Sequence, residues 1–149
     1  MPTELPAITQ AIAQYVYNTQ IEDFSEETIQ AAKAAIIDSL ACMLAGSLEQ
    51  LAKILCQYIE EEGGQPTASV IGKQIKTTTT NAALVNGAIG HALDYDDITE
   101  VTKTHPTVVL LPAVLALAEE NMSSGRDLLL AYLVGFEVAC SIGVGMSPA

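Results

Sequence analysis

Apolar residues recur at three- and four-residue intervals along most of this 149-residue chain, the spacing that places side chains on one face of an α-helix. Helix-start signals precede several of these stripes. Ser25 can cap a helix, Pro106 suits a first turn, and Ser124 with Asp127 forms a capping-box-like pair. One short stretch, residues 68–71, favours an extended element. The pattern therefore predicts an all-α helical bundle, with helices over residues 5–19, 25–46, 48–62, 81–93 and 107–120 and from residue 128 onward.

The charge balance argues against several classes of partner. The formal net charge is −12 with only six lysines and arginines, so the chain is poorly suited to bind nucleic acid or an anionic membrane surface. No uninterrupted apolar run reaches the roughly 18 residues of a membrane span, and the N-terminus lacks the basic region of a signal peptide. Three cysteines in separate apolar segments indicate buried free thiols. We therefore expect a cytoplasmic protein with no membrane partner, whose apolar content of 50% indicates a surface that a partner covers.

The segment 90–112, GHALDYDDITEVTKTHPTVVLLP, concentrates the polar chemistry of the chain. It contains both histidines and a group of acidic residues: His91, Asp94, Asp96, Asp97, Glu100 and His105. Clustered carboxylates raise the pKa of at least one of their number, and an imidazole nearby can transfer protons near neutral pH. The segment can therefore supply acid and base groups. With Lys103 as its only cation, it cannot bind a polyanion by itself.

The same residues also have simpler interpretations. A solvated acidic loop is common, and Asp96 and Glu100 are most simply solvated charges. His91 can satisfy a backbone group in the core. His105 can serve only as the flank of the helix that begins near Pro106.

Metal-binding patterns fit the segment poorly. Residues 94–105 begin like a calcium loop, but Thr99 stands where glycine is needed and His105 where the bidentate glutamate belongs. Residues 96–100 have the DDxxE form with which terpenoid synthases hold magnesium–diphosphate, yet the chain lacks the second ligand set and the basic residues. The two histidines lack a zinc-site spacing. We therefore predict no metal and no cofactor.

The stretch NAALVNGAIGHALDYDDITEVTKTHPTVVLLPAVLALAE, residues 81–119, resembles the MmgE/PrpD family. The family pattern is a small-residue helix, then H-A-L-D-[FY]-D-D, then H-P-[ST] and an apolar helix with an internal proline. The flanking IIDSLACMLAG, ASVIG and GRDLLLAYLVGFEVA segments agree, so the resemblance covers essentially the whole chain. Members include 2-methylcitrate dehydratase, cis-aconitate decarboxylase and iminodisuccinate epimerase.

The resemblance implies that residues 1–149 form part of a large helical domain. Family members are longer and add a smaller α+β lid domain, and further site residues, including basic ones, come from the part beyond this resemblance. It also implies a homodimer. The expected domain assignment is one partial helical domain without the C-terminal part and the lid.

Matching the family motif residue by residue assigns two catalytic groups. His105 is the expected acid/base or substrate-binding imidazole, and Asp94 is expected to orient the substrate or that histidine. Asp97, Thr99 and His91 are assigned to substrate binding, with Asp97 ordering the loop and His91 mainly structural. Many members have threonine directly after the paired aspartates; here Ile98 stands there, so Thr99 takes that role only weakly.

The implied activity is a cofactor-independent lyase or isomerase acting on a small di- or tricarboxylate by acid/base chemistry, and we expect the site to be incomplete in this short chain. Two alternatives stay open. The chain can be a non-catalytic helical interaction module that keeps the scaffold, or, less favoured, a magnesium-dependent terpenoid enzyme using DDxxE.

Overall fold

The computed structural model describes residues 7–100 and 103–146, and this part of the chain is mostly helical. The all-α fold class predicted from the sequence is confirmed. The elements in chain order are α1 (Ile8–Asn18), a 3-10 turn η1 (Ile21–Asp23), α2 (Glu26–Gly46), α3 (Gln50–Glu62), β1 (Ala68–Ser69), β2 (Lys76–Thr77), α4 (Thr79–His91), α5 (Pro106–Glu120) and α6 (Gly125–Met146).

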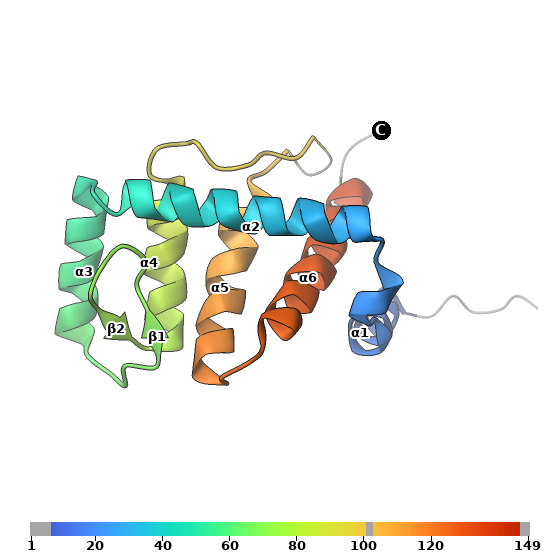
Figure 1. Cartoon of the computed structure of the whole chain (residues 1–149), viewed down its shortest axis with the longest axis horizontal. Helices are drawn as coiled ribbons and strands as arrows, with labels where there is room; N and C mark the ends of the chain where they lie inside the picture. Colours follow the sequence, from blue (N-terminus) through green and yellow to red (C-terminus); the bar gives the residue numbers. More distant parts are fainter. Residues whose placement is uncertain (1–6, 101–102, 147–149) are drawn as a thin grey trace, which may run out of the picture.

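Helix α2 lies across one end of a row formed by α3, α4, α5 and α6, with α1 at the far side beyond α6 (Figure 1). Helix α4 is central and packs against α2, α3 and α5. The core between these helices includes Met43, Val85, Ile89 and Leu111. The segment that joins α4 to α5 lies at the α2 end of the row, so the fold gathers the polar residues of this segment at one end of the bundle.

Small residues permit the close crossing of α2 and α4. A Cβ added at Gly46 would lie well inside 3.0 Å of the Ile89 carbonyl oxygen, and one added at Gly90 would lie 2.6 Å from Val108 and 3.3 Å from Met43. Because the neighbour of Gly46 is backbone, which cannot rotate away, only glycine fits at this position. The small-residue character of the 81–93 stretch is thus explained by its central position.

The predicted helix-start signals are confirmed. The Ser25 hydroxyl accepts the Thr28 backbone N–H (3.1 Å), and Asp127 and Ser124 bond each other's backbone N–H groups at the start of α6. Pro106 is the first residue of α5. Pro112 lies inside α5, which continues through it to Glu120.

The extended element near residues 68–71 is shorter than predicted and has a partner that the sequence did not reveal. β1 pairs antiparallel with β2, with Ala68 opposite Thr77. The buried Asn86 amide of α4 fixes this hairpin, because it accepts the Ile71 N–H (2.8 Å) and donates to the Ser69 carbonyl (2.9 Å). Thus α4 is bound to the hairpin by polar as well as apolar contacts.

Within residues 7–100 and 103–146, two helices are long and apolar enough to cross a membrane by length and composition alone, namely α2 and α6. The sequence had been expected to contain no such segment, because an uninterrupted apolar run is a stricter criterion than mean hydropathy. Helix α2 contributes Met43 to the core and lies across the other helices. A core helix of a soluble protein meets the same criterion, so the finding does not by itself indicate a membrane.

Candidate active site

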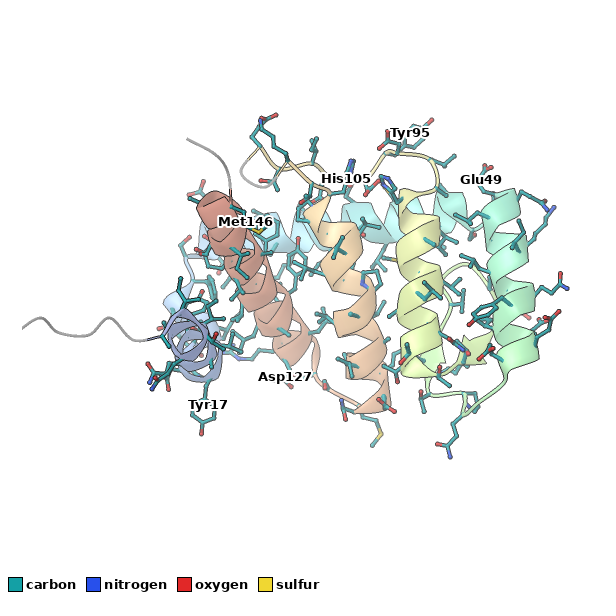
Figure 2. All side chains as sticks on the ribbon, turned by 180° about the vertical axis from the view of Figure 1, so that it is seen from behind. Tyr17, Glu49, Tyr95, His105, Asp127 and Met146 are labelled. Carbon is teal, nitrogen blue, oxygen red and sulfur yellow. The ribbon has the colours of Figure 1, made fainter. Side chains whose placement is uncertain are left out.

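The two histidines lie at facing ends of neighbouring helices. His91 is the last residue of α4 and His105 directly precedes α5 as its N-cap. Because α4 and α5 pack side by side, the imidazole rings meet edge to face, with centroids 4.7 Å apart and planes inclined at 65°. Figure 2 shows His105 at the same end of the bundle as Tyr95, opposite the Asp127 end. The fold therefore forms an imidazole pair from segments joined by a loop.

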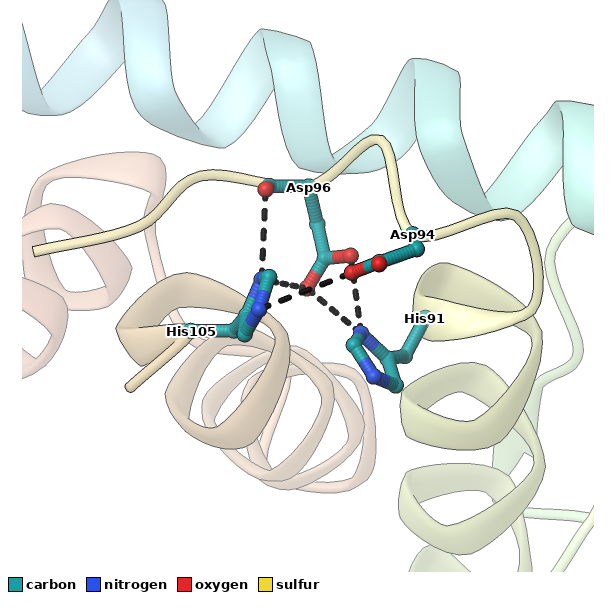
Figure 3. Close-up of side chains that lie close together, drawn as sticks. All are labelled: His91, Asp94, Asp96 and His105. Atoms are coloured by element: carbon teal, nitrogen blue, oxygen red, sulfur yellow. Dashed lines mark hydrogen bonds and ion pairs between the residues drawn. The ribbon is translucent and has the colours of Figure 1, made fainter. Parts of the chain in front are cut away.

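Asp96 lies between the two rings (Figure 3). Its carboxylate is 2.9 and 3.2 Å from His91 Nδ1 and 3.2 Å from His105 Nδ1, and its carbonyl oxygen is 3.3 Å from His105 Nδ1. The interpretation of Asp96 as a solvated charge is wrong, since its side chain has no exposed area. A carboxylate so buried requires partners, and the two imidazoles provide them.

Asp94 approaches the pair from the solvent side. Its Oδ1 lies 3.6 Å from His105 Nε2, while 78% of its side chain is exposed. Its backbone N–H bonds the His91 carbonyl (3.1 Å) and its φ is +54°, the left-handed conformation that often follows a helix end. Aspartate tolerates this conformation better than most residues. The structure thus brings Asp94 and His105 together, as expected from the sequence.

Asp97 points away from the imidazoles and holds the loop to two helices. Thr107 of α5 donates its backbone N–H (3.2 Å) and its hydroxyl to the Asp97 carboxylate. The Thr107 hydroxyl also lies 2.6 Å from the Tyr132 hydroxyl of α6. Asp97 therefore orders the loop as expected, while Thr107 and Tyr132 were missed. Nothing in the sequence distinguished Tyr132 from other apolar residues of α6.

The outer part of the loop forms a separate structure. Thr99 and Thr104 form an isolated antiparallel bridge, in which Thr99 donates its N–H to the Thr104 carbonyl (3.0 Å). Glu100 is exposed and pairs with Lys103, as its solvated interpretation predicted. Thr99 lies outside the imidazole–aspartate group, which is formed by His91, Asp94, Asp96 and His105.

The electrostatics of this group favour proton binding at His91. The hydrogen bond to Asp96 raises the pKa of His91 above its ordinary value, and the charges of Asp96 and Asp94 act in the same direction. His91 is half exposed, with 52% of its side chain accessible. Both imidazoles line an open groove of about 650 Å³ between α4 and α5, whose walls are largely apolar and include Gly87 and Val108. A small molecule in this groove can reach both rings.

Among the residues that the structure describes, the same four form a group that offers donors for a metal ion. One atom from each of His91, Asp94, Asp96 and His105 lies within 4.8 Å of the others. Two ligands of a zinc-sized ion are at most about 4.2 Å apart, so the set would have to contract. The DDxxE carboxylates do not gather at all, because Asp96 faces the imidazoles, Asp97 faces Thr107 and Glu100 faces Lys103. This arrangement argues against a magnesium–diphosphate site.

Comparison with known proteins finds one matching family model and several similar proteins. The family described as "MmgE/PrpD N-terminal domain" matches residues 10–149. Cis-aconitate decarboxylase of Homo sapiens is 34% identical over 139 residues, covering 90% of this chain and 29% of that protein. Cis-aconitate decarboxylase-like protein oryM of Aspergillus oryzae is 34% identical over 153 residues, covering 95% and 31%. The Mus musculus cis-aconitate decarboxylase is 32% identical over 139 residues, covering 90% and 28%. The chain thus spans about three tenths of the length of these relatives.

Proposed function

This chain belongs to the MmgE/PrpD family, and from that membership we propose that it contributes acid/base groups to a cofactor-independent lyase or isomerase acting on a small di- or tricarboxylate. The observation that supports this most directly is the pairing of His105 with Asp94 beside His91, at the mouth of a groove. The relatives named as cis-aconitate decarboxylases make a tricarboxylate of that kind the first substrate to test.

The proposed chemistry uses His105 as the proton-transferring group. Dehydration, decarboxylation and epimerisation of such acids all pass through a carbanion-like state next to a carboxylate, which needs a placed acid or base and stabilisation of negative charge. His105 Nε2 faces Asp94 and solvent. Asp94 orients the imidazole or the substrate, and Asp97 and Thr99 hold the loop that forms this wall of the site.

A polycarboxylate also needs positive charge, which this segment supplies sparingly. Lys103 pairs with Glu100, Lys76 with Glu119 and Arg126 with Glu22. We propose that the cationic groups come from polypeptide corresponding to the remaining length of the relatives. The proposed activity therefore belongs to a longer protein that contains this segment. We propose that this protein is cytoplasmic and forms a homodimer.

The test follows proton transfer rather than one product. A full-length protein containing this segment is incubated in D₂O with cis-aconitate and with related di- and tricarboxylates, and ¹H NMR records substrate loss and exchange of C–H next to the carboxylates. We expect His105→Ala to lower the rate by about 10²–10⁴-fold, the usual contribution of a general acid or base. Asp94→Asn should be similarly damaging, because it removes the negative charge beside His105. Asparagine keeps the shape and tolerates the left-handed backbone, so the loss would reflect the charge and not the fold.

Glu100→Gln is the matched control, because it removes an exposed carboxylate of the same loop that contacts Lys103. It should keep near-normal rates. Full activity in both His105→Ala and Asp94→Asn would place the site elsewhere. Turnover should survive exhaustive chelation; loss of turnover that magnesium restores would favour the metal-dependent alternative. A full-length protein that exchanges and consumes none of these acids would favour the non-catalytic module.

A further inference from the structure

We propose that Asp96 is a positioning residue that holds both imidazoles in the same tautomer, with hydrogen on Nδ1, so that His91 and His105 present two Nε2 atoms and act as a paired acid/base unit. This inference rests on the acid/base role proposed above and adds His91 to it as a second proton-transferring group. It assigns Asp96 a role through the rings, not through contact with substrate.

The partners of His105 determine where its hydrogen lies. Its Nδ1 faces the Asp96 carboxylate at 3.2 Å and the Asp96 carbonyl oxygen at 3.3 Å. An ionised carboxylate and a carbonyl only accept hydrogen bonds, so Nδ1 must donate and carries the hydrogen in the neutral ring. The 3.6 Å separation between Nε2 and Asp94 is longer than a hydrogen bond, so it leaves the Nε2 lone pair available in the neutral ring.

His91 is held in the same way from the other side. Its Nδ1 faces both oxygens of the Asp96 carboxylate, at 2.9 and 3.2 Å. The half-exposed ring lines the same groove as His105. When one ring is protonated and the other neutral, the pair offers an acid and a base within one site. Reactions that remove a proton and expel a leaving group need both functions.

The other titratable groups around Asp96 leave the two imidazoles as the partners of its carboxylate. The other carboxylates of the loop are engaged or solvated, since Asp97 bonds Thr107 and Asp94 is largely exposed. On α2, burial raises the pKa of the Cys42 thiol, with the charges of Asp38, Asp96 and Asp97 adding to the effect. The thiol therefore stays neutral, and the imidazoles are the groups that can balance the Asp96 charge.

The chain offers an unusually direct test, because it contains only two histidines. With ¹⁵N-labelled histidine in the 149-residue chain, long-range ¹H–¹⁵N correlation spectra show two rings and report which nitrogen of each carries hydrogen. Above the imidazole titrations we expect both rings with hydrogen on Nδ1 and an unprotonated Nε2. A wild-type spectrum with hydrogen on Nε2 in either ring would overturn the proposal, and this result does not depend on any variant folding.

Asp96→Asn then tests cause. The amide removes the charge and can donate as well as accept, so the Nδ1–H preference of His91 should be lost and the pKa of His91 should fall. His105 should keep hydrogen on Nδ1, because its Nδ1 still faces the backbone carbonyl of residue 96. Glu100→Gln, the same change elsewhere in the loop, should leave both rings as in the wild type. An unchanged His91 ring in Asp96→Asn would contradict the proposal.

The outcome is separable from that of the proposed function. If both rings carry hydrogen on Nδ1 but a full-length protein containing this segment turns over no carboxylate, the proposed activity is refuted and the pairing of the imidazoles stands. In an active full-length protein, Asp96→Asn should lower kcat with little change in KM and shift the pH profile, whereas unaltered kcat and pH profile would remove the positioning role.

Discussion

Gly46→Ala should be among the most destabilising single-methyl changes in this chain. Gly46 is the last residue of α2 and lies against α4, where an added Cβ would fall well inside 3.0 Å of the Ile89 carbonyl oxygen, 2.9 Å from its carbon and 3.2 Å from Ala92 Cβ. Two of these atoms belong to backbone and cannot rotate away. The helices must therefore move apart at the crossing, which also loosens the core around Met43.

The magnitude follows from two opposing effects. Overpacking typically costs about 1–3 kcal/mol, and a backbone collision belongs at the upper end of that range. Alanine in place of glycine returns up to about 1 kcal/mol of helix propensity. The net loss in the free energy of unfolding should be about 2 kcal/mol. For a chain of this size, each kcal/mol lowers the melting temperature by about 2–4 °C, so Gly46→Ala should melt roughly 4–8 °C below the wild type.

Gly87→Ala is the matched control, because Gly87 lies on α4, the helix that Gly46 contacts, but faces α5. Its added Cβ would lie 3.5 Å from the Val108 carbonyl oxygen and 3.8 Å from Pro112, which are ordinary contacts. The propensity gain should therefore leave Gly87→Ala as stable as the wild type or up to about 1 kcal/mol more stable. Thermal and urea unfolding followed by circular dichroism measure both variants. Equal stability of Gly46→Ala and Gly87→Ala would refute the close α2–α4 crossing.

Three further predictions follow. Ser25→Ala should lower the free energy of unfolding by about 1 kcal/mol, because the α2 N-cap bond is lost; an unchanged urea midpoint would argue against this cap. His91→Asn should destabilise the fold more below pH 6.5 than well above it, because the pKa of His91 is raised in the folded state. The protonated ring stabilises the fold below the pKa of the unfolded state, and this contribution disappears as pH rises through the folded-state pKa. Equal urea midpoint differences at pH 5.5 and 9 would contradict the His91–Asp96 bond. The exposed Ile142 and Val144 of α6 should promote self-association, so the sedimentation coefficient should rise with loading concentration. This concentration dependence should be weaker in Ile142→Lys. A monomer at high concentration would contradict self-association.

The helices could be predicted from the sequence because their signals are local. Apolar spacing and the capping side chains of Ser25 and Ser124 fix where α2 and α6 begin to within a few residues. The β2 strand escaped prediction because two residues, Lys76 and Thr77, are too few to show alternation. Its existence depends on pairing with β1 and on the Asn86 amide, which are tertiary contacts.

The sequence predicted most of the residues that form the candidate site, but not how these residues lie relative to one another. The family motif selected Asp94 and His105, and the fold places them together. Asp96 was assigned to solvent because an aspartate in an acidic loop usually is solvated. Its burial depends on the path of the loop between α4 and α5, which closes the two rings around the carboxylate. No periodicity or spacing encodes that path, so the central residue of the group was the one that the sequence concealed.

The Thr99–Thr104 bridge divides the α4–α5 connection into two independent parts. Residues 94–97 are fixed by the imidazoles and by Thr107, while the bridge closes the outer part on itself. The loop-closure entropy of a segment between Thr99 and Thr104 changes by about 0.6 kcal/mol per doubling of its length. Evolution can therefore vary the number of residues between the aspartates and His105 at little cost. An alignment that requires a fixed interval between the aspartates and the histidine would misplace His105 wherever the number of intervening residues differs.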